Sequence, residues 1–204
     1  NVWLDEQLAI LFQTQGWGPV PAGSLTAASS DASFRRYFRW QGDGRSFIVM
    51  DAPPPQENCR PFVDIARLLA RAGVNVPVIH GEDLERGFLL LSDLGNQTYL
   101  DVIDAGNADQ LFSDAIDALL AFQRLPMDAP LPSYDVALLR RELELFPEWY
   151  VGRELKASFD EQQAAAWQRV SSLLIDSALA QPKVLVHRDY MPRNLMRSEP
   201  NPGV

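Results

Sequence analysis

The sequence predicts an α+β fold in two lobes, a small antiparallel-sheet lobe followed by a larger helical lobe. Two patterns predict this division. Residues 25–51 and 76–91 contain short runs of strand-forming residues separated by polar turns, which is typical of strands. From residue 99 onward, apolar residues recur at helical spacing. We therefore expect one lobe over residues 1–93 and the second over residues 94–204.

The first lobe is expected to hold two helices and five strands. Residues 2–17 repeat apolar side chains at helical spacing and end among glycines. Residues 25–51 resemble a three-strand meander whose second turn is Gln41-Gly42-Asp43-Gly44. A helix is expected over residues 56–71, after three consecutive prolines, and strands over 76–80 and 88–91. The helix is thus inserted between the third and fourth strands.

The second lobe is expected to be helical over residues 99–104, 108–125, 135–150 and 159–179. Pro147 should kink the third of these helices beside Trp149 and Tyr150. Two neighbouring aromatic side chains can stack on a sugar or pack in a core, and the pattern leaves both roles open. A short strand is expected at Val184-Leu185-Val186.

A polar loop with a recognisable spacing follows this strand. His187-Arg188-Asp189 begins the loop, and Asn194 comes five positions after Asp189. This order and spacing is that of the catalytic loop in kinase-like folds. A carboxylate can accept the proton of an attacking hydroxyl, and a carboxamide oxygen can ligate magnesium beside nucleotide phosphates. We therefore predict a protein-kinase-like fold with Asp189 as the catalytic base and Asn194 as a Mg²⁺ ligand.

Two further segments stand where kinases contact their nucleotide. Ser30, Asp31 and Ser33 belong to a polar turn at the place where a phosphate-covering loop is expected. Their small side chains would let the backbone approach phosphates, although a plain hairpin turn is the alternative. Ser92, Asp93 and Leu94 follow the last expected strand, and we expect them to form the hinge whose backbone meets the adenine edge.

The sequence departs from kinases at the third strand. Kinases carry a lysine there that grips phosphates and pairs with a helix acid, but no lysine precedes Lys156. The corresponding position falls near Met50, and Asp64 would be a helix acid without its partner. Our hypothesis is that an arginine replaces the lysine; ordinary surface arginines are the alternative. The available cations are expected on the second strand, with the first and last on one face together with Tyr37: Arg35, Arg36 and Arg39.

Composition narrows the class of protein. The 204 residues carry a net charge of −9, which disfavours a nucleic-acid binder or a partner of anionic membranes. Cys59 is the single cysteine, so no intrachain disulfide can form, which favours a cytoplasmic location. The chain begins at Asn1, and the second metal-binding residue of kinases, an aspartate just after the catalytic loop, is missing, since no aspartate follows Asn194. We expect a trimmed N-terminus, further residues after Val204, and no activity from residues 1–204 alone.

Four segments together resemble the aminoglycoside phosphotransferase-like kinases: residues 30–39, 49–54, 91–95 and 187–196. Within that family the chain is most similar to bacterial anomeric amino-sugar kinases of cell-wall recycling. The resemblance implies ATP and Mg²⁺ as cofactors. It also implies phosphorylation of the C1 hydroxyl of N-acetylmuramate and N-acetylglucosamine to the α-1-phosphate. It further implies that residues 30–35, Arg35 included, cover the phosphates and that His187 holds the loop, whereas Arg188 stands where many relatives carry glycine.

Other functions remain open at this point. An aminoglycoside-inactivating kinase would use an acidic pocket for a cationic drug, which the net charge permits. A pseudokinase or nucleotide-binding scaffold would explain the missing lysine. The small-molecule acceptor, its contacts and the oligomeric state do not follow from the pattern. Three arginines could bind a lactyl carboxylate, but nothing in the sequence ranks them: Arg140, Arg141 and Arg193.

Overall fold

A computed structural model describes residues 2–30, 34–126, 131–199 and 203. The predicted phosphate-contacting residues Asp31 and Ser33 lie outside the described residues. The chain divides into two compact units. One unit comprises Asn1–Leu125 and Val186–Val204, and the other comprises Pro126–Leu185.

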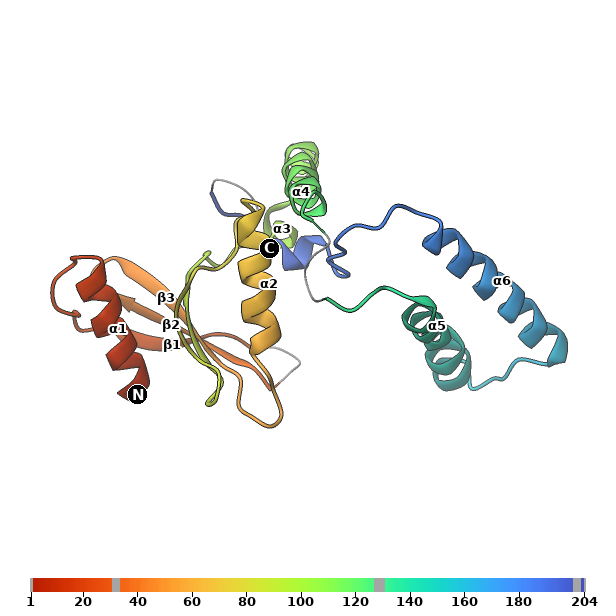
Figure 1. Ribbon diagram of the computed structural model, residues 1–204, viewed down its shortest axis with the longest axis horizontal. Coiled ribbons are helices and arrows are strands. Elements are labelled where there is room, and N and C mark those ends of the chain that lie inside the picture. Colours follow the sequence, from red (N-terminus) through yellow and green to blue (C-terminus); the bar gives the residue numbers. More distant parts are fainter. Residues whose placement is uncertain (1, 31–33, 127–130, 200–202, 204) are drawn as a thin grey trace. The chain divides into compact units, whose positions relative to one another are not determined.

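The first unit contains the five-stranded antiparallel sheet that the sequence predicts (Figure 1). Its strands, in the spatial order β1-β2-β3-β5-β4, are β1 Ser24–Ser30, β2 Arg36–Gly42, β3 Arg45–Asp51, β5 Phe88–Ser92 and β4 Ile79–Asp83. Asp43 and Gly44 form the β2–β3 turn with φ of 51° and 69°. Two successive positive φ angles are the conformation that suits the right-handed twist of a hairpin.

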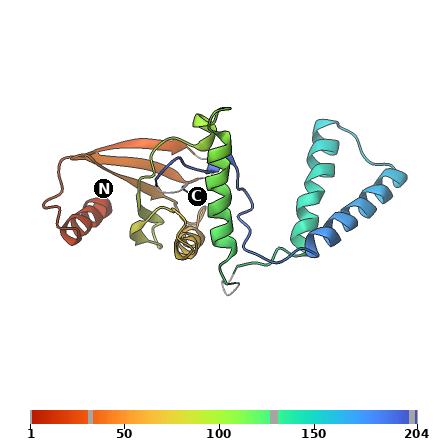
Figure 2. The ribbon, with the colours of Figure 1, turned by 90° about the horizontal axis from the view of Figure 1, so that it is seen from above.

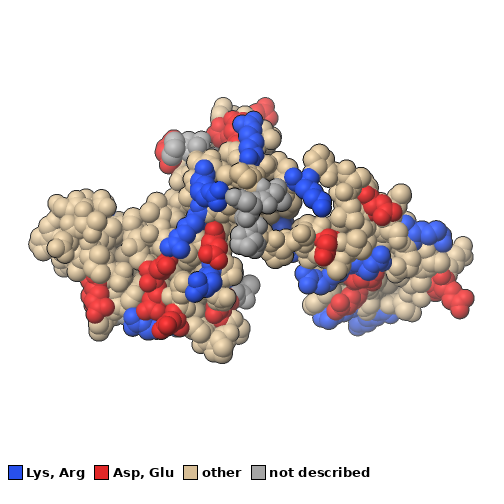
Figure 3. Space-filling view, in the orientation of Figure 1, with Lys and Arg blue, Asp and Glu red and all other residues tan. Residues whose placement is uncertain are grey.

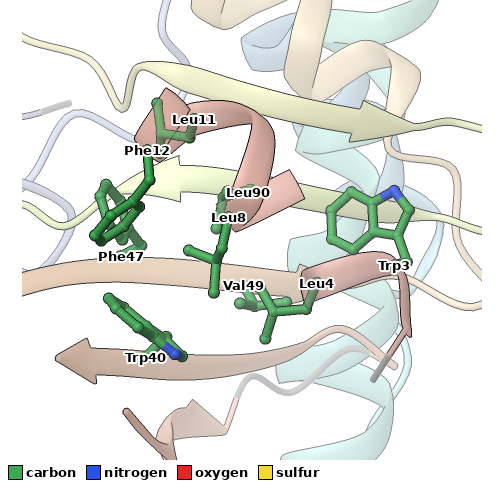
Figure 4. Close-up of a cluster of buried hydrophobic side chains, with 9 residues drawn as sticks. All are labelled: Trp3, Leu4, Leu8, Leu11, Phe12, Trp40, Phe47, Val49 and Leu90. Atoms are coloured by element: carbon green, nitrogen blue, oxygen red, sulfur yellow. The ribbon is translucent and has the colours of Figure 1, made fainter. Parts of the chain in front are cut away.

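One face of the sheet is covered by helix α1, Val2–Thr14. Leucine and aromatic side chains of α1 interlock with alternate residues of β2, β3 and β5 (Figure 4). The cluster consists of Trp3, Leu4, Leu8, Leu11, Phe12, Trp40, Phe47, Val49 and Leu90. Alternation along the strands therefore assigns Phe47 and Val49 to the α1 face and leaves the residues between them for the other face.

The opposite face is covered by helix α2, Arg60–Arg71 (Figure 1). Met50 and Leu89 of the sheet are fully buried with Val63 and Cys59 at the start of this helix. Tyr37 and Ile48 pack against the same cluster. The α2 face thus carries Met50, the residue near which the sequence predicts the position of the kinase lysine.

Two predicted elements begin later than expected, and proline explains both. The helix predicted from residue 56 begins at Arg60, with Pro61 in its first turn, where the missing N–H costs nothing. The strand predicted over 76–80 is β4, Ile79–Asp83. Pro77 cannot donate to a strand ladder. At Val78 the N–H donates to the Ser92 hydroxyl at 2.8 Å.

Two helices follow β5 within the first unit. Helix α3, Tyr99–Val102, begins with a capping box between Thr98 and Asp101. Helix α4, Ala108–Gln123, follows it. This unit continues past residue 93, where the sequence predicts the lobe boundary, to Leu125, and it includes the chain again from Val186. Thr98 forms a bridge with Met196, and Asn75 forms one with Gly203.

The second unit is a helical hairpin (Figure 2). Helix α5, Val136–Leu145, continues into a π-helix, Phe146–Glu154, and α6 spans Glu161–Leu179. The sequence predicted a kink at Pro147; the structure instead widens the helix, with Leu155 N–H donating to Tyr150 O at 2.9 Å. Trp149 and Tyr150 are each 52% exposed, so neither lies in a core. The Arg153 guanidinium lies 3.6 Å from the centre of the Trp149 ring.

The prediction of a strand at residues 184–186 is wrong, since this segment has no regular secondary structure. Leu185 is buried but Val186 is 57% exposed. A strand requires a neighbour that accepts its backbone hydrogen bonds, and apolar residues alone do not supply one.

Among the described helices, none combines the length and the apolar character needed to span a membrane.

Candidate active site

The predicted catalytic loop is fixed to the helices of the first unit. Its end forms a short 3-10 turn, Pro192–Asn194, and Leu195 is buried against Tyr99 and Ala115. Tyr99 N–H donates to Leu195 O at 2.8 Å. The Tyr190 hydroxyl donates to Ala115 O of α4 at 2.6 Å. Tyr190 and Leu195, the residues directly after Asp189 and Asn194, are therefore both anchored, which restricts where those two side chains can point.

Asp189 and Asn194 contact each other directly. The Asn194 amide nitrogen donates to Asp189 Oδ2 at 2.8 Å and to Asp189 O at 2.9 Å. Because the nitrogen makes both contacts, the amide oxygen is the atom that Asn194 presents for a cation. Both side chains are exposed, so the carboxylate can meet an alcohol from solvent. The spacing alone predicted this pair, and the structure brings its two members together.

His187 is half-buried, and its ring lies beside aromatic side chains. Its ring is 5.2 Å from the Tyr190 ring and 6.3 Å from the Phe122 ring, between centroids. Burial lowers its pKa, and the Asp189 charge offsets this only in part. An imidazole packed against two aromatic rings fits the loop-holding role that the resemblance implies for His187. Arg188 has φ of 73°, which is the left-handed region where glycine is favoured.

The predicted hinge is held by the side chain of Asp93. Arg39 donates to its carboxylate from Nε at 2.6 Å and from Nη2 at 3.0 Å. The Ser46 hydroxyl and the Gly95 N–H also donate to it, the latter at 2.9 Å. Arg39 Nη2 donates in addition to Gly95 O at 2.8 Å. The network ties the hinge to β2 and β3.

This network determines the charge of the hinge carboxylate. Burial of Asp93 opposes its ionisation, but the hydrogen bonds from Arg39, Ser46 and Gly95 outweigh burial, so its pKa lies below the ordinary value. Ser92 is also engaged, since its hydroxyl accepts from Val78 N–H. Both side chains are therefore turned to the protein, and the predicted contact with adenine through backbone groups at Asp93 and Leu94 remains a prediction.

Each of the three candidate arginines lies beside a carboxylate. Arg36 pairs with Asp51, its cross-strand neighbour, and alternation assigns it to the α1 face. Arg39 is committed to the hinge. Arg35 immediately precedes β2, and its Nε donates to Glu57 Oε2 at 3.0 Å. Arg35 is therefore the arginine that the structure places near α2 and away from the hinge.

The expected lysine–acid pair is absent from its usual positions. Met50 is completely buried, and Asp64 is an exposed residue of α2. Glu57, on the segment before α2, is the acid that meets an arginine. Neither residue type nor motif spacing in the sequence singled out Glu57. The signal available was its place two residues after the last of the three prolines, which give rigid support to a side chain directed back at the sheet.

The surface charges show many such local pairings. On the face shown in Figure 3, basic side chains lie beside acidic ones. Within the described residues, no group of three or more His, Cys, Asp or Glu side chains could hold a metal ion. Asn194 Oδ1, beside the Asp189 carboxylate, thus fits part of a Mg²⁺ site, which lacks the metal-binding aspartate that kinases carry after the catalytic loop.

This chain belongs to the phosphotransferase enzyme family, whose model matches residues 24–204. It is 80% identical over 204 residues to the N-acetylmuramate/N-acetylglucosamine kinase of Pseudomonas putida. It is 64% identical over the same length to the kinase of that name from Pseudomonas aeruginosa. Both matches include all of this chain but only 60% of the relative, so the chain spans about three fifths of the length of these relatives.

Solved structures support the fold. The gentamicin complex of APH(2")-IIa matches with a TM-score of 0.58 at 13% identity, over 96% of this chain and 67% of that one. A choline/ethanolamine kinase family protein from Mesorhizobium loti matches with a TM-score of 0.58 at 16% identity, over 98% and 62%. At such identities the likeness concerns architecture, and it confirms the two-lobed kinase-like class predicted from the sequence.

Proposed function

We propose that this chain carries the nucleotide-binding sheet and the catalytic loop of an ATP-dependent sugar kinase. The acceptors would be N-acetylmuramate and N-acetylglucosamine, phosphorylated at the anomeric C1 hydroxyl. The observation that carries the proposal is the direct contact between Asp189 and Asn194, in a chain 80% identical to a relative of that name. Such a reaction would serve peptidoglycan recycling in the cytoplasm.

The chemistry assigns one role to each loop residue. Asp189 accepts the proton of the C1 hydroxyl while that oxygen forms a bond to the γ-phosphorus. The bond between the γ-phosphorus and its bridging oxygen breaks, and ADP leaves with the electron pair. Asn194 orients Asp189 through its amide nitrogen and offers Oδ1 to magnesium. When bound, magnesium neutralises phosphate charge.

The remaining predicted contacts concern the nucleotide. Backbone groups of Asp93 and Leu94 would meet the adenine edge, and Ser92 would fix the start of the hinge. Ser30, Asp31, Ser33 and Arg35 would lie over the phosphates. Two observations support this assignment: the rigid hinge network around Asp93, and the place of Arg35 beside Glu57.

The test is a phosphoryl-transfer assay with labelled ATP on the protein made at the full length of its relatives. N-acetylmuramate, N-acetylglucosamine and kanamycin are supplied separately, with and without magnesium. We expect magnesium-dependent transfer to the two amino sugars. Transfer to kanamycin alone would identify an aminoglycoside kinase, and nucleotide binding without transfer would identify a scaffold; either result would refute the proposal.

Asp189→Asn provides the matched control. The amide preserves the size of the side chain but cannot take the proton of the hydroxyl. We expect kcat to fall by about 10²–10⁴-fold, the range typical of a positioned general base, with little change in the dissociation constant of ATP. An unchanged kcat in a folded Asp189→Asn variant would show that Asp189 is not the catalytic base.

A further inference from the structure

The segment between β3 and α2 holds an acid that the fold points back at the sheet. Glu57 follows Pro53-Pro54-Pro55, and its N–H donates to Pro53 O at 3.1 Å. Because proline fixes φ, the support under Glu57 is stiff. The Glu57 side chain is only 13% exposed, so its charge requires partners.

Glu57 uses both carboxylate oxygens on consecutive residues. Oε1 accepts from Phe34 N–H at 3.2 Å, and Oε2 accepts from Arg35 Nε at 3.0 Å. One carboxylate thereby fixes the backbone just before β2 and the direction of the arginine side chain. Burial opposes the charge on Arg35, but hydrogen bonds to Glu57 and Tyr37 outweigh it and raise its pKa. Arg35 therefore remains a cation.

The register of the sheet shows why this position matters. Tyr37 pairs with Met50 across β2 and β3, and both belong to the α2 face. Arg35 precedes Tyr37 by two residues and interacts with it. A lysine at Met50 would project from the same face toward the start of α2. The guanidinium of Arg35 thus approaches this region from the residue just before the neighbouring strand, β2.

We propose that Arg35, oriented by Glu57, replaces the missing pair of third-strand lysine and helix acid and binds the phosphates of the nucleotide. The inference rests on the proposed kinase function and deepens it. Arg35 is the phosphate-binding residue, and Glu57 is a positioning residue. A guanidinium suits this role because its fork of donors matches phosphate oxygens. The two other arginines are excluded, since Arg36 lies on the α1 face and Arg39 holds the hinge.

The experiment compares the binding of ATP and of adenosine to the full-length protein by calorimetry. Adenosine lacks phosphates, so a residue that contacts phosphates affects the dissociation constant of ATP alone. For Arg35→Ala we expect ATP binding to weaken about tenfold to a hundredfold, the range for a hydrogen bond to a charged group. Adenosine binding should remain unchanged. Arg35→Lys should retain part of the ATP affinity.

Two variants test the division of roles. Glu57→Gln leaves the Arg35 guanidinium in place but removes the charge that orients it. We therefore expect a smaller loss of ATP affinity than in Arg35→Ala. Arg36→Ala removes an adjacent arginine from the opposite face and should leave both dissociation constants unchanged. Thermal unfolding of each variant verifies that it is folded. If Arg35→Ala does not fold, the ATP and adenosine dissociation constants of Arg35→Lys test the proposal instead.

The outcomes separate this inference from the proposed function. If the wild type binds ATP but Arg35→Ala and Arg35→Lys bind it equally well, the inference is overturned and the kinase assignment stands. Equal losses for ATP and adenosine would also overturn it, since they indicate a general disturbance of the site. If the wild type binds no ATP, the kinase assignment fails and this inference fails with it.

Discussion

Removing the carboxylate of Asp93 is the sharpest test of how the hinge is held. Four hydrogen bonds end on this group, two from Arg39, one from Ser46 and one from the Gly95 N–H. The side chains of Asp93 and Arg39 are 8% and 19% exposed. Asp93→Ala would leave the arginine charge largely shielded from water with no carboxylate.

The expected cost follows from that burial. Breaking one partner from a fully buried ion pair costs about 3–5 kcal/mol. Because Arg39 keeps some access to water and its bond to Gly95 O, we expect the lower end, about 3 kcal/mol of unfolding free energy. ATP binding should weaken as well, because the hinge backbone loses its fixed direction.

Chemical denaturation of the full-length protein measures the stability change, and calorimetry measures ATP binding. Arg36→Ala is the matched control, because Arg36 forms an ion pair on the same hairpin with a side chain 63% exposed. A pair of that kind contributes about 0–1 kcal/mol. If Asp93→Ala costs no more than Arg36→Ala, the network does not hold the hinge and our reasoning is wrong.

Acid sensitivity provides an independent reading of the same network. The pKa of Asp93 in the folded protein lies below its unfolded value. Its ionised form therefore stabilises the fold above pH of about 4. This stability is lost as the pH falls through the folded-state pKa. In Arg39→Ala that pKa should rise, so a pH titration of stability should show a smaller loss on acidification. An unchanged acid profile would contradict the assignment.

The remaining predictions concern backbone fit and the loop anchor. In Gly87→Ala the new Cβ would meet Ala52 O at 2.0 Å at a φ of +77°; we expect a loss of about 3 kcal/mol or failure to fold. Gly44→Ala, with positive φ but open space, should cost only about 1 kcal/mol, and equal effects would refute the steric argument. Tyr190→Phe removes the bond to Ala115 O and should cost about 1 kcal/mol in denaturant unfolding, with a lower kcat. Burial raises the pKa of Tyr190 to about 12, so wild-type stability should fall as pH rises from about 10 to 12. Tyr190→Phe should lose less over that range; an identical alkaline profile would exclude this tyrosine as its source.

Local rules were enough for most of the elements. The strand meander, the turn at Asp43 and Gly44 and the amphipathic α1 each follow from residue types within a few positions. The predicted start of an element was wrong where a single residue opposed the pattern, as Pro77 does before β4. The strand at 184–186 was wrong because strand formation depends on a partner that the local pattern cannot show.

The sequence by itself determined the class of fold and the Asp189–Asn194 pair, because the chemistry of that loop depends on residues five positions apart. The tertiary structure decided the use of the arginines. The sequence does not distinguish the roles of three neighbouring arginines, Arg35, Arg36 and Arg39. Their carboxylate partners lie 15 to 54 positions away in the chain. Strand alternation and register decide which face each cation occupies, and only folding brings those distant acids to them.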